Sequence, residues 1–569
     1  MKLGLGALGR LRPRLRPQEG FWMGLVARHG TLRRAAERRS SRVGGLMERA
    51  GVVGNPYAVS ARSLVSTLLS APAALLVAGA GFLLWLPLLA VSLVPTVVYA
   101  APELRLRDKV SQRSEQVERE LPFFSLLVHV LGSAGVPLYE VLTGVVDAGM
   151  FPAIRTEAMM VRRDVAVFGA DPNEALERLA SGHPSRKFRS FVYGYTSKVR
   201  SGGDMPAYLS GESGSLLREL EESWERYAAR AGMVGSMMVT VFGLMPLMLI
   251  VVGVFSPAAS LNGIVLFTAV GVPSFTVFLV YLAGRLQPVG ERPPTGNLLG
   301  SLLVAALGAA PVLLFGAPWL SVAAFTFLLC VSYGLSVRNQ MREMKDIDDA
   351  LPEFLKDVLD FKRQEYDLTK SLRSISLNNR YNESFDRILA RVAVQLKAGV
   401  PVDELALDPR TNLARLMFLV LGQMWRSGGG TVDTVYQLSA YAEKVVAMKR
   451  STVSEMKPYL VLSYLSPLLL AFGVTFVGGL LRSFGSGASP GLSALGISGS
   501  RFGGSAAAMS EVSSILIVVS AAALGIIAAK MVDFTVRNTI RSSMNVAVAV
   551  AATYVLSSVG LQGLTHLVP

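Results

Sequence analysis

Long uncharged runs alternate with blocks rich in charged residues along this chain of 569 residues. A membrane-spanning helix needs about 20 residues to cross the apolar slab of a bilayer. The uncharged runs at 64–101 and 299–336 have room for two short spans each, and the run at 233–284 holds two more. The region 458–529 holds a further two, at about Pro458–Leu481 and Val512–Ala529, and 545–567 holds a ninth. The pattern therefore predicts an all-α, polytopic membrane protein with about nine transmembrane helices.

The runs at 64–101 and 299–336 are too long for one span each. A single helix over 64–101 would be about 57 Å long, almost twice the thickness of the apolar slab. Turns are expected near Trp85-Leu86-Pro87 in the first run and at Gly316-Ala317-Pro318 in the second. Each run is therefore predicted to form a transmembrane hairpin.

Two polar blocks, 102–232 and 337–457, separate the predicted membrane helices. Their apolar positions recur at helical spacing, as Leu127 and Leu131 do in the first block. Each block is therefore predicted to fold as a helical bundle outside the membrane.

Positive charge at the start of the chain sets the expected orientation. Residues 1–62 hold thirteen Arg and Lys but only three Glu, and basic flanks lie on the cytoplasmic side of membranes. This basic arm and both polar blocks are then cytoplasmic, the Gly/Ser-rich stretch 483–508 is an exterior loop, and the C-terminus lies outside. Within the arm a helix is expected over Thr31–Ala50, ending at Gly51. The arm either touches anionic lipid or a partner, or forms a solvated flank of the first span.

The order of hairpin, polar block and two spans occurs twice, which suggests an internal duplication. Leu121-Pro122 opens the first block and Leu351-Pro352 opens the second. Late in the two blocks stand Arg200-Ser201-Gly202-Gly203 and Arg426-Ser427-Gly428-Gly429. The interval from proline to arginine is nearly the same in both blocks. The shared order and near-equal spacing predict two copies of one helical bundle.

These landmarks have an ordinary structural interpretation. Pro122 and Pro352 are expected in the first turn of a helix, where the missing N–H costs nothing. The paired glycines should form tight turns, with Arg200 and Arg426 capping the carbonyls of the preceding helix. Neither turn has the Lys-Ser/Thr of a phosphate-binding loop, and the glycine pattern at 4–9 follows no strand, so no nucleotide site is predicted.

Composition argues against an enzyme. The chain is 51% hydrophobic and only 17% charged, so its net charge of +15 indicates membrane topology before it indicates nucleic acid. A single cysteine, Cys330, excludes a disulfide within the chain, and four scattered histidines lack metal-ligand spacing. We predict no catalytic residues, cofactor or metal. The predicted spans contain no Asp, Glu, Lys or Arg, which counts against a proton-coupled carrier.

Two long polar helices are expected to run directly into membrane spans. One covers about Leu216–Ala231 before the third span, and the other covers about Thr434–Met456 before the seventh. A push on the cytoplasmic end of such a helix would tilt or rotate its membrane part. The alternative is a solvated face beside a membrane helix.

The ordered landmarks resemble those of the type II secretion system F domain, the platform family of type IV pilus, Tad pilus and archaellum machines. The resemblance covers roughly residues 45–530, in a fused double-domain form that looks archaeal. In the first copy it is carried by Glu120-Leu121-Pro122-Phe123-Phe124, Ala134-Gly135-Val136-Pro137-Leu138 and Arg200-Ser201-Gly202-Gly203. In the second it is carried by Leu351-Pro352, Lys397-Ala398-Gly399-Val400-Pro401 and Arg426-Ser427-Gly428-Gly429. The second copy has Gln364-Glu365-Tyr366-Asp367 in place of Gly135-Val136-Pro137, so that turn is expected to differ.

The resemblance implies a non-enzymatic, multi-pass platform of the cytoplasmic membrane, acting as a homodimer. The implied partners are a cytoplasmic hexameric secretion ATPase, pilin-like or archaellin subunits and membrane lipid, with no nucleic acid. The candidate ATPase contact is the basic face of the second polar helix, at Lys444, Lys449 and Arg450. The alternative function is a duplicated-repeat transporter or permease, which would have a polar site at the membrane midplane.

Overall fold

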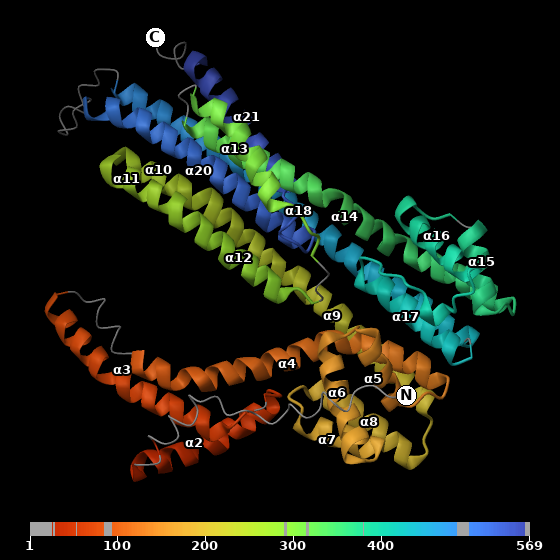
Figure 1. The fold of residues 1–569 in the computed structure, drawn as a ribbon. Coiled ribbons are helices and arrows are strands. Elements are labelled where there is room, and N and C mark those ends of the chain that lie inside the picture. The colour runs from red at the N-terminus through yellow and green to blue at the C-terminus, as the bar shows by residue number, and fades with distance from the viewer. Residues whose placement is uncertain are drawn as a thin grey trace. The chain divides into compact units, whose positions relative to one another are not determined.

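The described part of the chain is entirely helical. The computed structural model describes residues 26, 29–52, 54–84, 94–255, 257–288, 293–314, 318–378, 380–428, 430–485 and 500–563. These residues form helices and turns and no β-strand, which confirms the all-α class (Figure 1). The chain divides into two compact units, Met1–Leu216 and Leu217–Pro569.

The first unit begins with helices that precede a small bundle. Its elements are α2 (Gly30–Arg49), α3 (Pro56–Leu84), α4 (Val94–Ser133), α5 (Leu138–Ala148), α6 (Pro152–Phe168), α7 (Pro172–Gly182), α8 (Arg186–Ser201) and the start of α9 (Met205–Val239). In the bundle core, the ring of Phe124 meets the rings of Phe151 and Phe191 edge-on, each at 6.2 Å between centroids. Apolar residues at helical spacing therefore form the core that the sequence indicated.

The second unit holds most of the apolar helices and a second small bundle. Its elements are the rest of α9, the π-helix η3 (Thr240–Leu244), α10 (Met245–Phe255), α11 (Pro257–Leu266), the π-helix η4 (Phe267–Gly271), α12 (Val272–Leu286), α13 (Leu298–Leu314), α14 (Pro318–Arg363), α15 (Leu368–Asn378), α16 (Glu383–Lys397), the 3-10 helix η5 (Val402–Glu404), α17 (Asn412–Arg426), α18 (Val432–Gly485), α20 (Ser500–Val532) and α21 (Ile540–Gly563). A cluster of buried apolar side chains joins α9 through α12 to α18, α20 and α21.

Five helical stretches in the described part are long and apolar enough to cross a membrane, which supports a multi-pass membrane protein. Two shorter apolar helices cover Leu298–Leu314 and Ile540–Leu556. The first predicted hairpin is not among these seven, and many side chains of 64–101 lie outside the described residues. The five long stretches are Met205–Val252, Asn262–Leu286, Pro318–Arg363, Val432–Val477 and Ser510–Val532.

The helices that join polar blocks to predicted spans are continuous. The chain stays helical from Met205 through η3 to Phe255, and α18 is one helix of 54 residues. Both long polar helices therefore run, as expected, into apolar stretches long enough to span a membrane. The helix α18 extends to Gly485 and α20 begins at Ser500, so the loop predicted at 483–508 is too long at both ends. Residues 486–499, like the turns expected at 85–87 and 316–317, lie outside the described residues.

The prediction that Pro122 and Pro352 begin helices is wrong. Pro122 lies inside α4 and Pro352 lies inside α14. A proline inside a helix loses one backbone hydrogen bond, but the neighbours Leu121 and Leu351 are fully buried, and this packing holds both helices together. Glu120, two residues before Pro122, accepts hydrogen bonds from the N–H groups of Ala153 and Ile154 at the start of α6.

The glycine turns occur where expected, but the arginines do not cap carbonyls. Gly202, Gly428 and Gly430 have positive φ, whereas Gly203 does not, and Gly429 lies outside the described residues. Arg200 Nη2 lies 2.5 Å from Glu177 Oε2, and Arg426 Nε lies 3.7 Å from Asp403 Oδ2. Each arginine therefore reaches an acid on the preceding element, because that charge partner is stronger than a neutral carbonyl.

The turn that was expected to differ between the two blocks has the same backbone conformation in both. Gly135 has φ +83° and Glu365 has φ +64°. The N–H of Val136 donates to Leu131 O at 3.0 Å, and the N–H of Tyr366 donates to Phe361 O at 3.1 Å. The expectation was wrong because the hydrogen bonds of the helix end fix this conformation whether or not glycine occupies it.

This turn gives a direct test of backbone strain. We expect Gly135→Ala to lower the free energy of unfolding by about 1 kcal/mol, because a Cβ there meets no neighbouring atom but is strained at positive φ. Glu365→Gly should have the opposite sign. Thermal unfolding of the purified chain measures both, with Gly144→Ala inside α5 as a control that should not destabilise. Equal effects of Gly135→Ala and Gly144→Ala would contradict the assignment.

Candidate functional site

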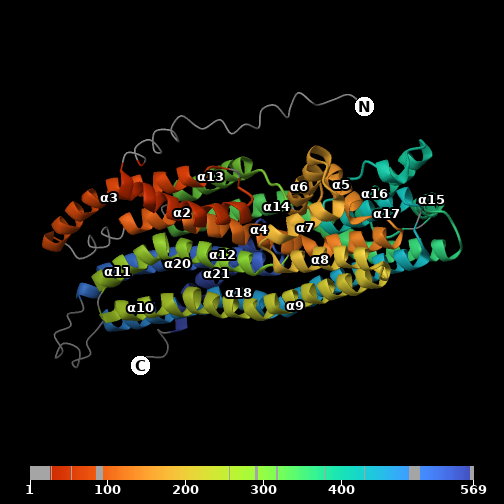
Figure 2. The ribbon, with the colours of Figure 1, turned by 90° about the horizontal axis from the view of Figure 1, so that it is seen from below.

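The helices α9–α10 and α18 run side by side in the same direction within the second unit (Figure 2). The ring of Tyr459 fills the space beside Gly235, and its hydroxyl lies beside Gly232. Further along, Leu247 of α10 packs into the space left by Gly473 of α18. Residue numbers rise together along both helices, so the packing is parallel. Missing side chains at these glycines allow the close approach, as in other membrane helix pairs.

The π-helix η3 lies in the middle of this pairing. A Cβ on Gly243 of η3 would lie 3.0 Å from the Oγ of Ser466 on α18. π-Helical turns frequently occur at functional sites, because the extra residue shifts the faces of the helix on either side. Along the helix, η3 lies between the glycines that Tyr459 contacts and Leu247.

Ion pairs fix the polar end of α18. Lys444 Nζ lies 2.7 Å from Glu221 on α9, Lys449 Nζ lies 2.7 Å from Asp348 on α14, and Arg450 Nη2 lies 2.7 Å from Asp349. The structure thus brings all three predicted contact residues to one stretch of α18, and pairs each with an acid of the same unit. The pairs of Lys444 and Arg450 are partly exposed, and an exposed pair contributes only about 0.2–1 kcal/mol, whereas the pair of Lys449 with Asp348 is mostly shielded from solvent. Together the three pairs fix the position of α18 against α9 and α14.

Contacts of α9 with the turn between α20 and α21 were not predicted. The hydroxyl of Tyr227 donates to Met531 O at 3.2 Å, and the ring centroids of Trp224 and Phe534 lie 5.3 Å apart. Lys530 Nζ donates to Gln287 Oε1 at 2.7 Å and to Phe534 O at 3.2 Å. The sequence signal was weak, since two aromatic residues on a polar helix and one lysine after a span are common features.

The same turn carries a compact charged group. Arg541 Nη2 donates to Asp533 Oδ1 at 2.8 Å, and Asn538 Nδ2 donates to Asp533 Oδ2 at 2.8 Å. Arg537 donates to the carbonyl oxygen of Pro294, in the segment before α13. This turn therefore connects the last apolar helix to the lead-in of the second predicted hairpin.

The first unit contains a buried charged cluster. Glu157 of α6 is 1% exposed and accepts from Arg113 Nε at 2.7 Å and Nη2 at 2.6 Å. His183 Nε2 lies 3.6 Å from the same carboxylate. Burial alone would raise the pKa of Glu157, but the neighbouring His183 and the two hydrogen bonds from Arg113 outweigh it, so the pKa lies below its usual value. Arg113 also donates to the carbonyl of Arg49 at 2.8 Å, which ties the end of α2 to the bundle.

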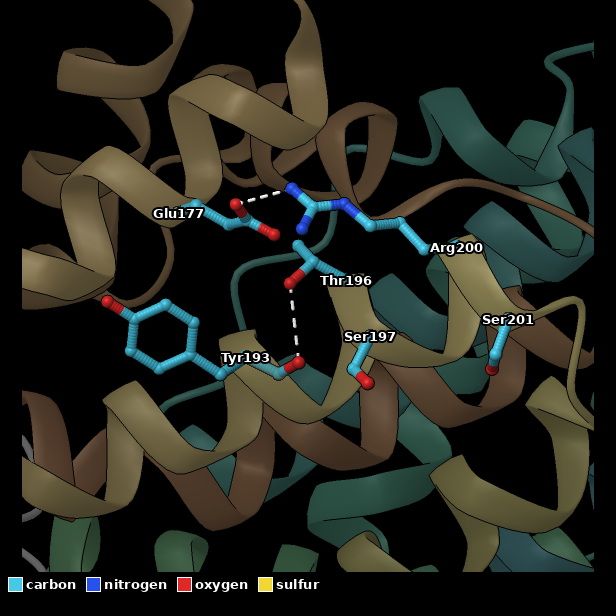
Figure 3. A pocket seen from close by; sticks show the side chains of 6 residues that line it. All are labelled: Glu177, Tyr193, Thr196, Ser197, Arg200 and Ser201. Atoms are coloured by element: carbon cyan, nitrogen blue, oxygen red, sulfur yellow. Dashed lines mark hydrogen bonds and ion pairs between the residues drawn. The ribbon is translucent and has the colours of Figure 1, made fainter.

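Arg200 of the predicted turn lies at an open hollow of about 550 Å³ in the first unit. In Figure 3 its guanidinium reaches across to Glu177 of α7, above Tyr193 and Thr196 of α8. In the second block, Gly422 occupies the position four residues before Arg426 that Thr196 occupies before Arg200. A Cβ on Gly422 would lie only 3.1 Å from Asp403 Cα, so η5 lies directly on α17. The acid is carried by α7 in the first block and by η5 in the second, and the two blocks thus differ in how closely this element approaches the helix that carries the arginine.

Comparisons with known proteins agree with part of this description. Residues 124–253 match the family described as "Type II secretion system (T2SS), protein F". The match runs from α4 through the first bundle and α9 into α10. The chain is similar to the uncharacterized protein MJ1286 of Methanocaldococcus jannaschii, with 20% identity over 425 residues, covering 64% of this chain and 69% of that protein. No solved structure matches the chain.

Adding one methyl group at a contacting glycine tests the close approach of α9 and α18. We expect Gly235→Ala to destabilise the chain by about 1–3 kcal/mol, because the new Cβ overlaps the Tyr459 ring. Thermal unfolding followed by intrinsic fluorescence would measure the change. Gly214→Ala, on the same helix but with nothing within reach of the new Cβ, is the control. Gly235→Ala behaving like Gly214→Ala would refute the close approach.

Stability of the first unit should depend on the charge of Glu157. Its pKa in the folded state lies below the unfolded value of about 4.3, so its contribution is present above about pH 4.3 and is lost as pH falls further. Removing the charge with Glu157→Gln should cost about 3–5 kcal/mol at pH 7, because Arg113 loses its buried partner.

Thermal unfolding between pH 6 and pH 3 would measure this dependence. The Glu157→Gln variant should show a flatter pH profile than the parent chain, whereas Glu174→Gln, an exposed acid on α7, should leave the profile unchanged. If the stability of the Glu157→Gln variant falls with pH as steeply as that of the parent chain, a group other than Glu157 causes the pH dependence.

Proposed function

We propose that this chain is the non-enzymatic membrane platform of a type IV pilus-like or archaellum assembly machine. A cytoplasmic hexameric ATPase would dock on the two polar blocks, and its movement would pass through the chain to pilin-like or archaellin subunits in the membrane. The observation that carries the proposal is the continuity of α9–η3–α10 and of α18 from polar block to apolar helix. The match of residues 124–253 and the similar archaeal protein support it.

We infer that the two polar blocks are copies of one bundle. Both α5 and α15 have 11 residues. When their first residues are aligned, four buried positions coincide, Leu138, Val141, Leu142 and Val145 against Leu368, Ser371, Leu372 and Ile375. Two helices often share a length by chance, but agreement at four buried positions is a stronger indication of a common origin.

The later helices agree at a second constant offset in residue number. Ser185 caps α8 by accepting from Phe188 N–H, and Thr411 caps α17 by accepting from Ala414 N–H. At the same offset, Glu177 pairs with Arg200 as Asp403 pairs with Arg426. These matched caps and ion pairs support equivalence of α8 with α17, and therefore of α9 with α18.

If α9 and α18 are equivalent, their contact joins corresponding helices of the two copies. Leu247 packs on Gly473, and these two positions are separated by the same offset as the matched caps Ser185 and Thr411. Equivalent positions of two parallel helices meet only near a pseudo-two-fold axis that runs along them. The two copies would then move as a coupled pair within one chain, and the predicted homodimer of such chains stays a prediction.

Within this proposal the cations of α18 act as ties. Lys444 holds α18 to α9, and Lys449 and Arg450 hold it to α14, so a displacement of one block would be shared by three long helices. Triple charge reversal with Glu at these positions should abolish filaments while the chain still inserts into the membrane.

A charge swap distinguishes ties from direct docking. Filament counts should fall in Lys449→Asp and recover in Lys449→Asp with Asp348→Lys, because the swapped pair restores the tie between α18 and α14. Co-purification of the ATPase with the full chain should persist in both variants. Loss of ATPase binding that the swap does not restore would identify Lys449 as a docking residue, and no co-purification with the parent chain would reject the platform function.

A further inference from the structure

The helix α2 turns one face inward and presents arginines on the other. Ala36, Val43 and Met47 are buried against α3 and α4. Arg39, on the same inner side, donates to Ser63 Oγ at 2.9 Å and stacks on the Tyr99 ring at 3.8 Å. These contacts fix the rotation of α2 about its axis. Within the described residues of the arm, α2 is therefore a docked helix.

The fixed rotation aligns three exposed arginines along the outer face. Arg34, Arg38 and Arg42 follow each other at four-residue spacing, and the described residues supply no acidic partner for their guanidinium groups. Like charges at this spacing repel one another and destabilise a helix. An anionic partner from outside the chain would remove this repulsion. We call Arg34, Arg38 and Arg42 the arginine stripe.

The position of the stripe along α3 indicates what that partner is. Gly44 lies beside Pro56 at the start of α3, and Ala36 packs with Ala61 and Val65, so the two helices are antiparallel. Continuing this pairing residue by residue places Arg34 within one helical turn of Leu68. Leu68 and Leu69 are 60% and 66% exposed, in the uncharged run that is predicted to enter the membrane.

We propose that the arginine stripe binds the phosphate groups of anionic membrane lipids. The stripe begins within one turn of the first exposed leucines and extends away from the apolar run for about 12 Å. The headgroup layer is roughly 5–8 Å thick on each side of the apolar slab, so the stripe spans this layer and extends beyond it. Electrostatic attraction reaches about 8 Å at physiological salt, so all three guanidinium groups lie within range of lipid phosphates. Lipid binding would hold α2, and through Arg113 the bundle of the first unit, at the membrane surface.

The test uses the full chain purified in detergent and phosphatidylglycerol as the probe, with phosphatidylcholine for comparison. Native mass spectrometry would count the bound lipids of each kind. We expect Arg34→Gln, Arg38→Gln, Arg42→Gln to reduce the preference for phosphatidylglycerol by about fivefold per arginine. The matched control is Lys370→Gln, Arg373→Gln, Arg380→Gln, which removes three exposed cations from the second block and should leave the preference unchanged.

A charge-conserving variant completes the design. Replacing the three arginines by lysine should retain the lipid preference, because the attraction depends on charge. Circular dichroism and hydrogen exchange of α2 should be alike in all variants, since these side chains point away from the packed face. The proposal is overturned if the Gln variant keeps its preference, if the control loses it equally, or if the Gln variant loses only a co-purifying acidic protein or nucleic acid.

Discussion

Helical continuity across the edge of the apolar region constrains everything else in this protein. A helix resists bending because each turn is joined to the next by backbone hydrogen bonds, so a continuous helix transmits a displacement along its length. The helix α18 runs 54 residues without interruption, and α9, η3 and α10 are continuous from Met205 to Phe255. Prolines inside these helices do not divide them, because tertiary packing holds the turns on both sides.

Close packing makes the two long helices a pair. Glycine at positions 235 and 473 removes the side chain that would otherwise separate α9–α10 from α18, and Tyr459 and Leu247 fill the spaces. At the polar end, the pair of Lys444 with Glu221 joins the same helices outside the apolar part. Apolar contacts in one region and ion pairs in another therefore hold both ends of the helix pair in register.

The interiors of the two polar blocks differ in their buried charge. The first encloses a charged cluster in which Glu157 is paired with Arg113 and lies beside His183, whereas α16 of the second block buries the apolar side chain of Ile388. A buried carboxylate requires its partners, whereas an isoleucine requires only neighbours. The charged cluster joins the end of α2 to the first bundle, so it serves a connection that this bundle makes with the arm.

The sequence by itself determined the helical class, the apolar runs, and the places where glycine ends a helix. These properties depend on local composition and periodicity, which neighbouring residues along the chain decide. Only the tertiary structure decided that Pro122 and Pro352 lie inside helices, that Glu365 adopts the turn of Gly135, and that Lys444, Lys449 and Arg450 meet acids on other helices. The physical reason is that burial on both sides of a proline and charge partners far away along the chain depend on packing between distant segments. The spacing of side chains along one helix does not determine that packing.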